Sequence, residues 1–164
     1  MSTMTVLVPM RRELFDQFAA EANEAYAADN VLTGRWSRED ARTKAEEEFA
    51  HLLPQGVDTP DHFFYEVKNP AADSVGFVWF AIVGTGAARA GYVFNIHIQP
   101  GEQRKGHGRA ALVALESIAA GMNLPAIRLN VFGHNPGAQS LYRSIGYEVT
   151  ASSMRKVLHK DVSS

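Results

Sequence analysis

The chain has 164 residues, of which 46% are hydrophobic and 21% charged, with a net charge of −2 and no cysteine. This balance predicts one globular domain (residues 1–160) followed by a disordered tail (161–164). It excludes a broad basic surface for nucleic acid or anionic lipid, and it excludes disulfides, thiolate nucleophiles and cysteine-bound metals. Without a secretory signal or an apolar stretch long enough for a bilayer, we expect a cytoplasmic protein with no membrane partner.

The first third of the chain predicts one strand and two helices. Met4–Val8 reads as a short strand, and Met10–Ala28 as a helix because its apolar residues recur at helical spacing. A second helix is expected to begin at Ser37 and to stop before Pro54. Ser37 and Asp40 lie three residues apart, which is typical of a loose capping box.

The middle of the chain predicts an antiparallel meander. Phe63–Lys68, Val75–Val83 and Tyr92–Ile98 are short segments rich in β-branched and aromatic residues. Short turns separate them, and the glycine-rich Gly84–Gly91 is the connection before the third.

The last third alternates helices with strands. Gly108–Ala120 and Pro136–Ile145 are expected helices, and Ile127–Phe132 is an expected strand between them. Tyr147–Val149 and Met154–Leu158 are expected to form a final strand pair. The layout predicts an α/β (α+β) fold, in which a mixed, mostly antiparallel central sheet of six to seven strands has helices on both faces.

The stretch Gln103–Gly108 lies between a predicted strand and a predicted helix. Its two glycines allow a ligand's phosphate oxygens to approach the backbone, and the helix that follows offers unpaired N–H groups and the positive end of its dipole. Arg104, Lys105 and Arg109 add positive charge where a helix disfavours cations unless an anion joins them. The alternative is a plain glycine turn with basic side chains in solvent.

A second informative stretch runs from Asn135 to Tyr147. Asn135 followed by Pro136 is a typical helix start. The helix then carries one apolar stripe that includes Tyr142. On these residues alone, Asn135 could simply be a cap and Tyr142 a core aromatic.

Together these stretches resemble the GNAT N-acetyltransferase superfamily. The first matches Q-x-x-G-x-G after a strand, and the second matches N-x-x-A-x-x-L-Y-x-x-x-G-Y about 30 residues further on. The resemblance covers Tyr92 to Tyr147. It implies a single-domain enzyme that moves an acetyl group from acetyl-coenzyme A to a primary amine in a ternary complex, with a splay between the two central strands.

The resemblance also implies roles for individual residues. The coenzyme A pyrophosphate would bind the backbone of the loop formed by Gln103, Arg104, Lys105, Gly106, His107 and Gly108, with Arg109. The pantetheine arm and thioester would lie along the strand edge at Ile96 and Ile98, and Asn135 would be a polar contact near the coenzyme. Tyr142 would be the general acid for the departing thiolate. No metal is implied, and the histidines show no metal-ligand spacing.

The general base is where the chain departs from the family pattern. Many GNAT enzymes place a glutamate on the strand that corresponds to Tyr92–Ile98, and this strand has no carboxylate. His97 is its one near-neutral titrating group and the first candidate base, with His134 the second. The alternative for His97 is a partly buried, hydrogen-bonded sheet histidine, while His107 is expected to face solvent or the coenzyme.

The acceptor site is expected in the N-terminal half, because in the family the first two helices wall that side of the cleft. Acids and aromatics there would suit a cationic amine, either a small molecule or a peptide. The candidates are Tyr26, Asp29, Asn30, Trp36 and Phe49. The alternative is that Trp36 and Phe49 are core residues and the acids are solvated. Many family members are dimers, so a homodimer is one expectation.

Two other functions fit parts of the sequence. A non-catalytic acyl-CoA-binding or regulatory domain of the same fold would explain the missing strand carboxylate. A dinucleotide-binding enzyme is suggested by Gly84–Arg89, which half matches G-x-G-x-x-G. An arginine stands where the motif has its third glycine, and no helix clearly follows. A hairpin loop is therefore the simpler interpretation.

Overall fold

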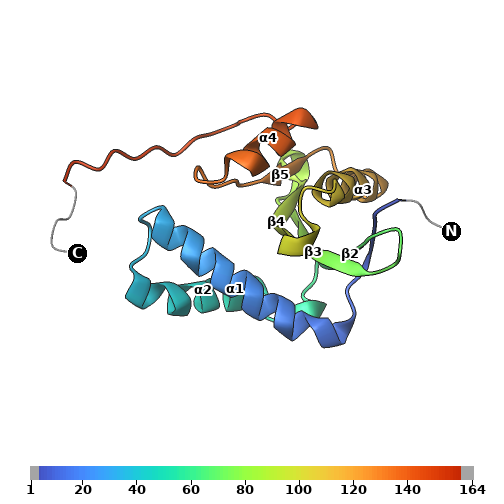
Figure 1. Ribbon diagram of the computed structural model, residues 1–164, viewed down its shortest axis with the longest axis horizontal. Helices are drawn as coiled ribbons and strands as arrows, with labels where there is room; N and C mark the ends of the chain where they lie inside the picture. The colour runs from blue at the N-terminus through green and yellow to red at the C-terminus, as the bar shows by residue number, and fades with distance from the viewer. Residues whose placement is uncertain (1–3, 160–164) are drawn as a thin grey trace. The chain divides into compact units, whose positions relative to one another are not determined.

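The computed structural model describes residues 4–159, and the expected tail 161–164 lies outside this range. The chain divides into two compact units, Met1–Phe132 and Gly133–Ser164. Among the described residues, no helix is both long enough and apolar enough to cross a bilayer. The elements in chain order are β1 (Val6–Pro9), α1 (Phe15–Leu32), α2 (Arg38–Leu52), β2 (His62–Lys68), β3 (Ser74–Val83), β4 (Ala90–Ile98), α3 (His107–Gly121), β5 (Ile127–Leu129) and α4 (Pro136–Ser144) (Figure 1).

The first unit is built on a five-stranded sheet in the order β1-β2-β3-β4-β5. The first four strands pair antiparallel, and β5 pairs parallel to β4. The predicted meander and the mostly antiparallel character are confirmed. The parallel pair arises because α3 carries the chain from the end of β4 back to the start of β5.

The expected six to seven strands are wrong, because the sheet has five strands within residues 4–159. Tyr147–Val149 and Met154–Leu158 form no strand in the structure. Most of their side chains are exposed, and a short isolated strand pair is not stable in water without a surface to pack on. The expected strand Ile127–Phe132 is also shorter, and its pairing ends at Leu129.

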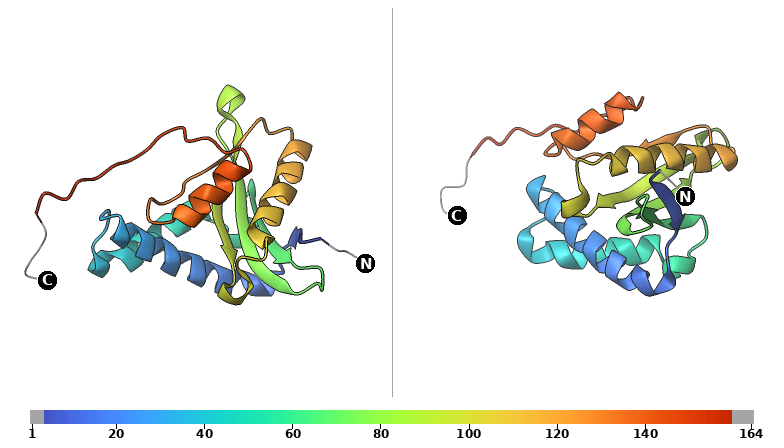
Figure 2. Two further views of the ribbon diagram at one scale, coloured as in Figure 1. Left: turned by 45° about the horizontal axis from the view of Figure 1, so that its top comes forward. Right: turned by 45° about the vertical axis from the view of Figure 1, so that its right-hand side comes forward.

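Helices cover both faces of the sheet, as predicted (Figure 2). On one face α3 packs Ala111 and Leu115 against Val78 and Phe80 of the central strand. On the other, Phe18 of α1 contacts three aromatic rings of β2 and β3, with ring centroids 5.7, 5.8 and 6.3 Å away. The alternation along β3 therefore divides the core into two apolar layers.

The helix boundaries follow from local chemistry. Ser37 caps α2, since the backbone N–H of Asp40 donates to its Oγ at 3.2 Å, so the predicted cap is confirmed. The helix expected over Met10–Ala28 begins later, at Phe15, after a 3₁₀ turn at Arg12–Leu14, and extends to Leu32. In its last turn, the carbonyl oxygen of Asn30 accepts the backbone N–H groups of Arg35 and Trp36 in the connection to α2.

Gly76 on β3 permits close approach of β4. A Cβ at this position would overlap the carbonyl oxygen of His97 and press on the side chain of Ile98. The register pairs Gly76 with Ile98 and Phe77 with His97, so the missing side chain sets the position of the end of β4.

We therefore expect Gly76→Ala to lower the free energy of unfolding by about 2 kcal/mol, because a backbone carbonyl cannot move aside as a flexible side chain can. Urea denaturation measures the loss. Gly121→Ala is the matched control, since nothing lies within 4 Å of the Cβ it would add. Equal stability of Gly76→Ala and the wild type would contradict this view of the β3–β4 contact.

Candidate active site

The turn between β4 and α3 presents backbone amides to open space. Arg104 and Gly106 both have left-handed backbone, with φ of 63° and 85°. Gly106 is the N-cap of α3, and nothing lies within 4 Å of the Cβ position it leaves empty. The first N–H groups of a helix have no partner within it, so the open side of this turn leaves room for an acceptor to approach them.

The side chains around this turn are mostly tied to the protein. Gln103 Nε2 donates to the carbonyl oxygen of Ile98 at 3.0 Å, which folds the turn back onto the end of β4. Lys105 Nζ lies 3.2 Å from Glu102 Oε2. Arg104, Lys105 and Arg109 are all exposed. The turn thus combines a backbone held to the end of β4 with positive charge at its exposed surface.

Of the two places expected for His107, solvent is excluded. Its side chain is buried, with 8% exposed, and does not face solvent. Its Nδ1 lies 3.0 Å from the hydroxyl of Thr5, and its Nε2 lies 3.5 Å from Glu102 Oε2. The ring joins the start of α3 to the segment before β1, so it shapes the turn from within the protein.

The pairing of β4 changes at Phe94. Strand β5 pairs only with Gly91, Tyr92 and Val93, and the register with β3 skips Phe94, which forms a β-bulge. A bulge bends its strand and leaves one residue outside the ladder. Beyond it, the edge of β4 that carries Ile96 and Ile98 has no β5 partner. The expected splay between the two strands therefore begins at the bulge, which the sequence pattern did not reveal.

Aromatic rings hold the bulge from the α1 side. Phe94 stacks on Trp79 with ring centroids 4.6 Å apart, and His62 stacks on Phe94 at 5.7 Å. Trp79 Nε1 donates to His62 Nδ1 at 2.9 Å, and burial lowers the pKa of His62. The neutral imidazole of His62 therefore uses its Nδ1 lone pair to accept this hydrogen bond. Because that lone pair is occupied, His62 is a structural partner of Trp79 and a poor base.

An open groove of about 680 Å³ lies between α1 and the end of β4. One side is a stripe of α1 that includes Gln17, Glu21 and Glu24, and the other includes His97 and the turn at Gln99–Gly101. His97 is exposed, and no side-chain hydrogen bond to it occurs within residues 4–159. The alternative that His97 is a partly buried, hydrogen-bonded histidine is thus wrong. The sequence did not indicate that Glu21 and Glu24 line this groove.

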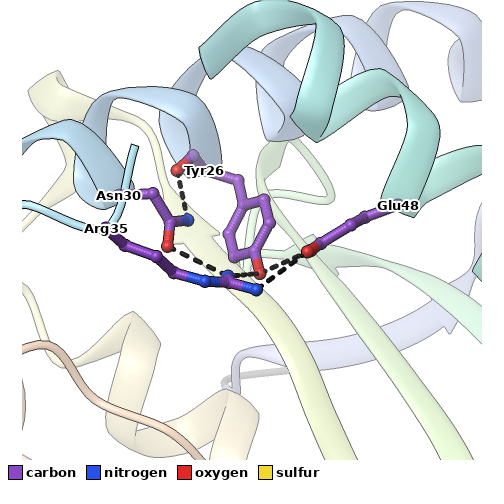
Figure 3. A network of polar contacts seen from close by, with 4 residues as sticks. All are labelled: Tyr26, Asn30, Arg35 and Glu48. Carbon is purple, nitrogen blue, oxygen red and sulfur yellow. Dashed lines mark hydrogen bonds and ion pairs between the residues drawn. The ribbon is translucent and has the colours of Figure 1, made fainter. Parts of the chain in front are cut away.

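Residues expected at the acceptor site instead hold α1 to α2 (Figure 3). Arg35 donates to Tyr26 Oη at 3.0 Å, to Asn30 Oδ1 at 3.1 Å and to Glu48 at 2.9 Å. Tyr26 donates to Glu48 Oε2 at 2.8 Å, and Asn30 donates back to the carbonyl oxygen of Tyr26. Burial, together with the hydrogen bond to Glu48, raises the pKa of Tyr26.

The aromatic candidates are also part of the packing. Trp36 is buried against Ala41 and Ala45 and meets Tyr26 edge to face at 5.5 Å. Phe49 packs on Trp79 at 5.1 Å. Trp36 and Phe49 are therefore core residues, as the alternative interpretation held.

The second unit contains the other motif. Asn135 Oδ1 accepts the N–H of Ala138 at 3.2 Å and caps α4, which confirms its role as a cap. The ring of Tyr142 lies 5.7 Å from that of Tyr147, and burial raises the pKa of Tyr142. Its phenol therefore stays protonated at neutral pH, as a proton donor must.

Comparison with known proteins agrees with this geometry. The pattern of the acetyltransferase (GNAT) family matches residues 16–147. YycN of Bacillus subtilis, described as an uncharacterized N-acetyltransferase, is 31% identical over 94% of this chain and 100% of its own length. Its crystal structure superposes with a TM-score of 0.90 over 96% of this chain and 100% of that one, at 30% identity.

More distant relatives extend the similarity. YdgE of Bacillus subtilis, also described as an uncharacterized N-acetyltransferase, is 27% identical over 93% of this chain and 97% of its own. A Pyrococcus furiosus protein at 24% identity has the same fold, with a TM-score of 0.66 over 94% of this chain and 99% of that one. On the family match and the YycN identity, the chain belongs to the acetyltransferase (GNAT) family.

Proposed function

We propose that this acetyltransferase moves the acetyl group of acetyl-coenzyme A to a primary amine by direct attack in a ternary complex. The observation that carries the proposal is the course of β4. This strand leaves β5 at the Phe94 bulge, borders the groove at His97, and leads through a short 3₁₀ turn into the glycine turn that opens α3. One strand thus connects an anion-binding turn, a free backbone edge and a groove.

The residues of the turn and the strand edge fit coenzyme A. A pyrophosphate would accept from the backbone amides at Gly106–Gly108, with Arg104, Lys105 and Arg109 near its charge. The edge of β4 at Ile96 and Ile98 would pair with the amides of the pantetheine arm as an added strand does. The buried side chain of His107 contributes support to the turn. Bound there, the coenzyme would supply an activated acyl thioester.

The groove suits a cationic amine acceptor. Glu21 and Glu24 are exposed carboxylates on its α1 side, so they would attract a protonated amine, as most alkylamines are at neutral pH with a pKa of about 10. His97, on the opposite side, would take the proton directly or through water before the amine attacks. Apolar Phe77, Ala25 and Ala28 would contact the carbon skeleton of the acceptor.

The remaining steps need a donor for the oxygen of the intermediate and an acid for the leaving thiolate. A backbone N–H at the bulge would stabilise the oxygen of the tetrahedral intermediate. Tyr142 would protonate the departing thiolate; this role rests on its place in the family motif. Asn135 keeps its proposed place near the coenzyme, although its side-chain oxygen caps α4.

The second candidate is a non-catalytic acyl-CoA-binding domain. The observation that favours it is the absence of any carboxylate on β4. Calorimetry with acetyl-CoA, followed by a free-thiol release assay over a panel of amines, separates the two. Binding with thiol release supports the transferase, and binding with no release on any amine supports the alternative.

We expect Gly106→Glu to abolish acetyl-CoA binding with at least about a 100-fold increase in Kd, because a carboxylate would occupy the pyrophosphate position. Gly86→Glu is the matched control, since Gly86 also has positive φ and open space around it but lies in the β3–β4 connection. Calorimetry on both folded variants gives the comparison. Equal affinities of the two variants for acetyl-CoA would contradict binding of the coenzyme at this turn.

His97→Gln should lower kcat by about 100-fold and leave the Kd of acetyl-CoA unchanged, as expected for loss of a general base. His51→Gln, on the exposed end of α2, is the control and should retain full activity. The readout is thiol release with the best amine of the panel. A fully active His97→Gln enzyme would rule out His97 as the base.

Tyr142→Phe should reduce kcat by about 10-fold or more without raising KM for acetyl-CoA, since it removes a proton donor but keeps the ring. Tyr147→Phe removes the hydroxyl of the neighbouring ring and should have a smaller effect. Steady-state kinetics on the two variants measure the difference. If both variants lose activity equally, the hydroxyl of Tyr142 has no special role.

A further inference from the structure

Asn95 is a polar residue on the aromatic side of the sheet. In the ladder it lies directly opposite Trp79, and residues that face each other across an antiparallel pair point to the same side. The ring of Trp79 packs edge to face against that of Phe18 in α1, so Asn95 also lies on the α1 side. The next residue, Ile96, lies opposite Val78 and packs on the α3 side.

The β-bulge at Phe94 turns Asn95 to the α1 side. Val93, two residues earlier, packs in the cluster on the α3 side, and strict alternation would place Asn95 there as well. The extra residue at Phe94 shifts the alternation by one, so Asn95 and then His97 lie on the α1 side instead. The bulge therefore brings both polar side chains of the second half of β4 to the side of the sheet that holds the groove.

The carboxamide of Asn95 has no hydrogen-bond partner in the part of the first unit that the structure describes. The side chain is half-buried, and within residues 4–132 no side-chain hydrogen bond to it occurs. A polar group that leaves water without such a bond lowers the stability of the protein, and an apolar side chain of similar size would avoid this cost. The amide group is therefore available to a molecule from outside the protein.

We infer that Asn95 binds the amino group of the acceptor and orients it for attack, an inference that rests on the proposed function. Along the α1 side of β4, Asn95 lies between the bulge, where the oxygen of the intermediate is proposed to bind, and His97, which borders the groove. Residues two apart on a strand are separated by about 7 Å, so one nitrogen atom between Asn95 and His97 can contact both side chains.

The chemistry of the attack gives this contact its role. A neutral amine that directs its lone pair at a carbonyl carbon has only N–H groups left to offer the protein, so it needs hydrogen-bond acceptors. His97 accepts the proton that is lost, and Asn95 Oδ1 accepts the second N–H. A primary amine supplies both N–H groups, whereas a secondary amine supplies one. Asn95 therefore selects primary amines over secondary amines.

NMR titration tests this contact without requiring turnover. Butylamine, added in the presence of coenzyme A, should shift the side-chain carboxamide resonances of Asn95. Those of Asn69 are the internal control and should not move, because Asn69 Oδ1 accepts the backbone N–H of Asp73 in the β2–β3 turn. Asn95 resonances that stay unchanged at the highest concentration of butylamine would overturn the inference. A shift of Asn95 in a protein that releases no thiol would contradict the proposed transfer and still support amine binding by Asn95.

Asn95→Leu tests the selection of primary amines. It should lower kcat/KM for the best primary amine of the panel by about 10- to 100-fold, and the preference over the N-methyl derivative of that amine should fall by about 10-fold. The Kd of acetyl-CoA should stay the same, and stability in urea should not fall, because the replaced amide makes no hydrogen bond within residues 4–132.

Asn23→Leu is the matched control for these measurements. The Oδ1 of Asn23 is also buried without a hydrogen-bond partner among the described residues, but Asn23 is not one of the α1 residues that line the groove. This variant should keep the kinetics and the amine preference of the wild type. An Asn95→Leu enzyme that keeps the full preference for the primary amine, or that loses acetyl-CoA affinity in parallel, would overturn the inference.

Discussion

Strand β4 is the constraint on which the rest of the structure depends. It pairs with β3 along nearly its whole length but with β5 over only three residues, from Gly91 to Val93. Because backbone groups in a protein interior must be paired, a strand that loses one neighbour halfway along needs another partner or solvent on that edge. The β-bulge and the loss of pairing with β5 both occur at Phe94, so the course of β4 itself creates the opening between the two strands.

The packing around β4 explains why the opening stays where it is. On the α1 side, the stacked rings of Trp79 and Phe94 hold the bulge, and His62 accepts the indole N–H of Trp79. On the other side, α3 packs Leu115 against the inner strands. Gly76 then allows the end of β4 to approach β3 closely. A rigid frame of this kind keeps a site's geometry without needing rigid loops.

The two ends of the proposed site differ in electrostatic character. At the glycine turn, exposed cations meet the positive end of the α3 dipole, an arrangement that an anion would relieve. In the groove, Glu21 and Glu24 face the end of β4, where a cationic acceptor would be favoured. Opposite charge preferences at the two ends would help an anionic donor and a cationic acceptor bind in the correct orientation.

The helix and strand pattern could be predicted from the sequence because it depends on local chemistry. The cap at Ser37, the alternation along β3 and the glycine turn at Gly106 are each read from a few neighbouring residues. The same holds for the family motifs, since both are contiguous stretches. The C-terminal strand pair was wrong because a strand needs a partner, and no local pattern supplies one.

The sequence by itself therefore determined the fold class, the family and the two motif segments. Only the tertiary structure decided which side chains share the groove. Glu21 and Glu24 lie on the same face of α1 as many other polar residues, and only the packing of α1 against the sheet brings them to the groove that His97 borders. Tertiary contacts likewise joined Tyr26 and Arg35 of the α1 end to Glu48 of α2 and buried His107 beside Thr5, because hydrogen-bond partners far apart in sequence are chosen by the folded chain.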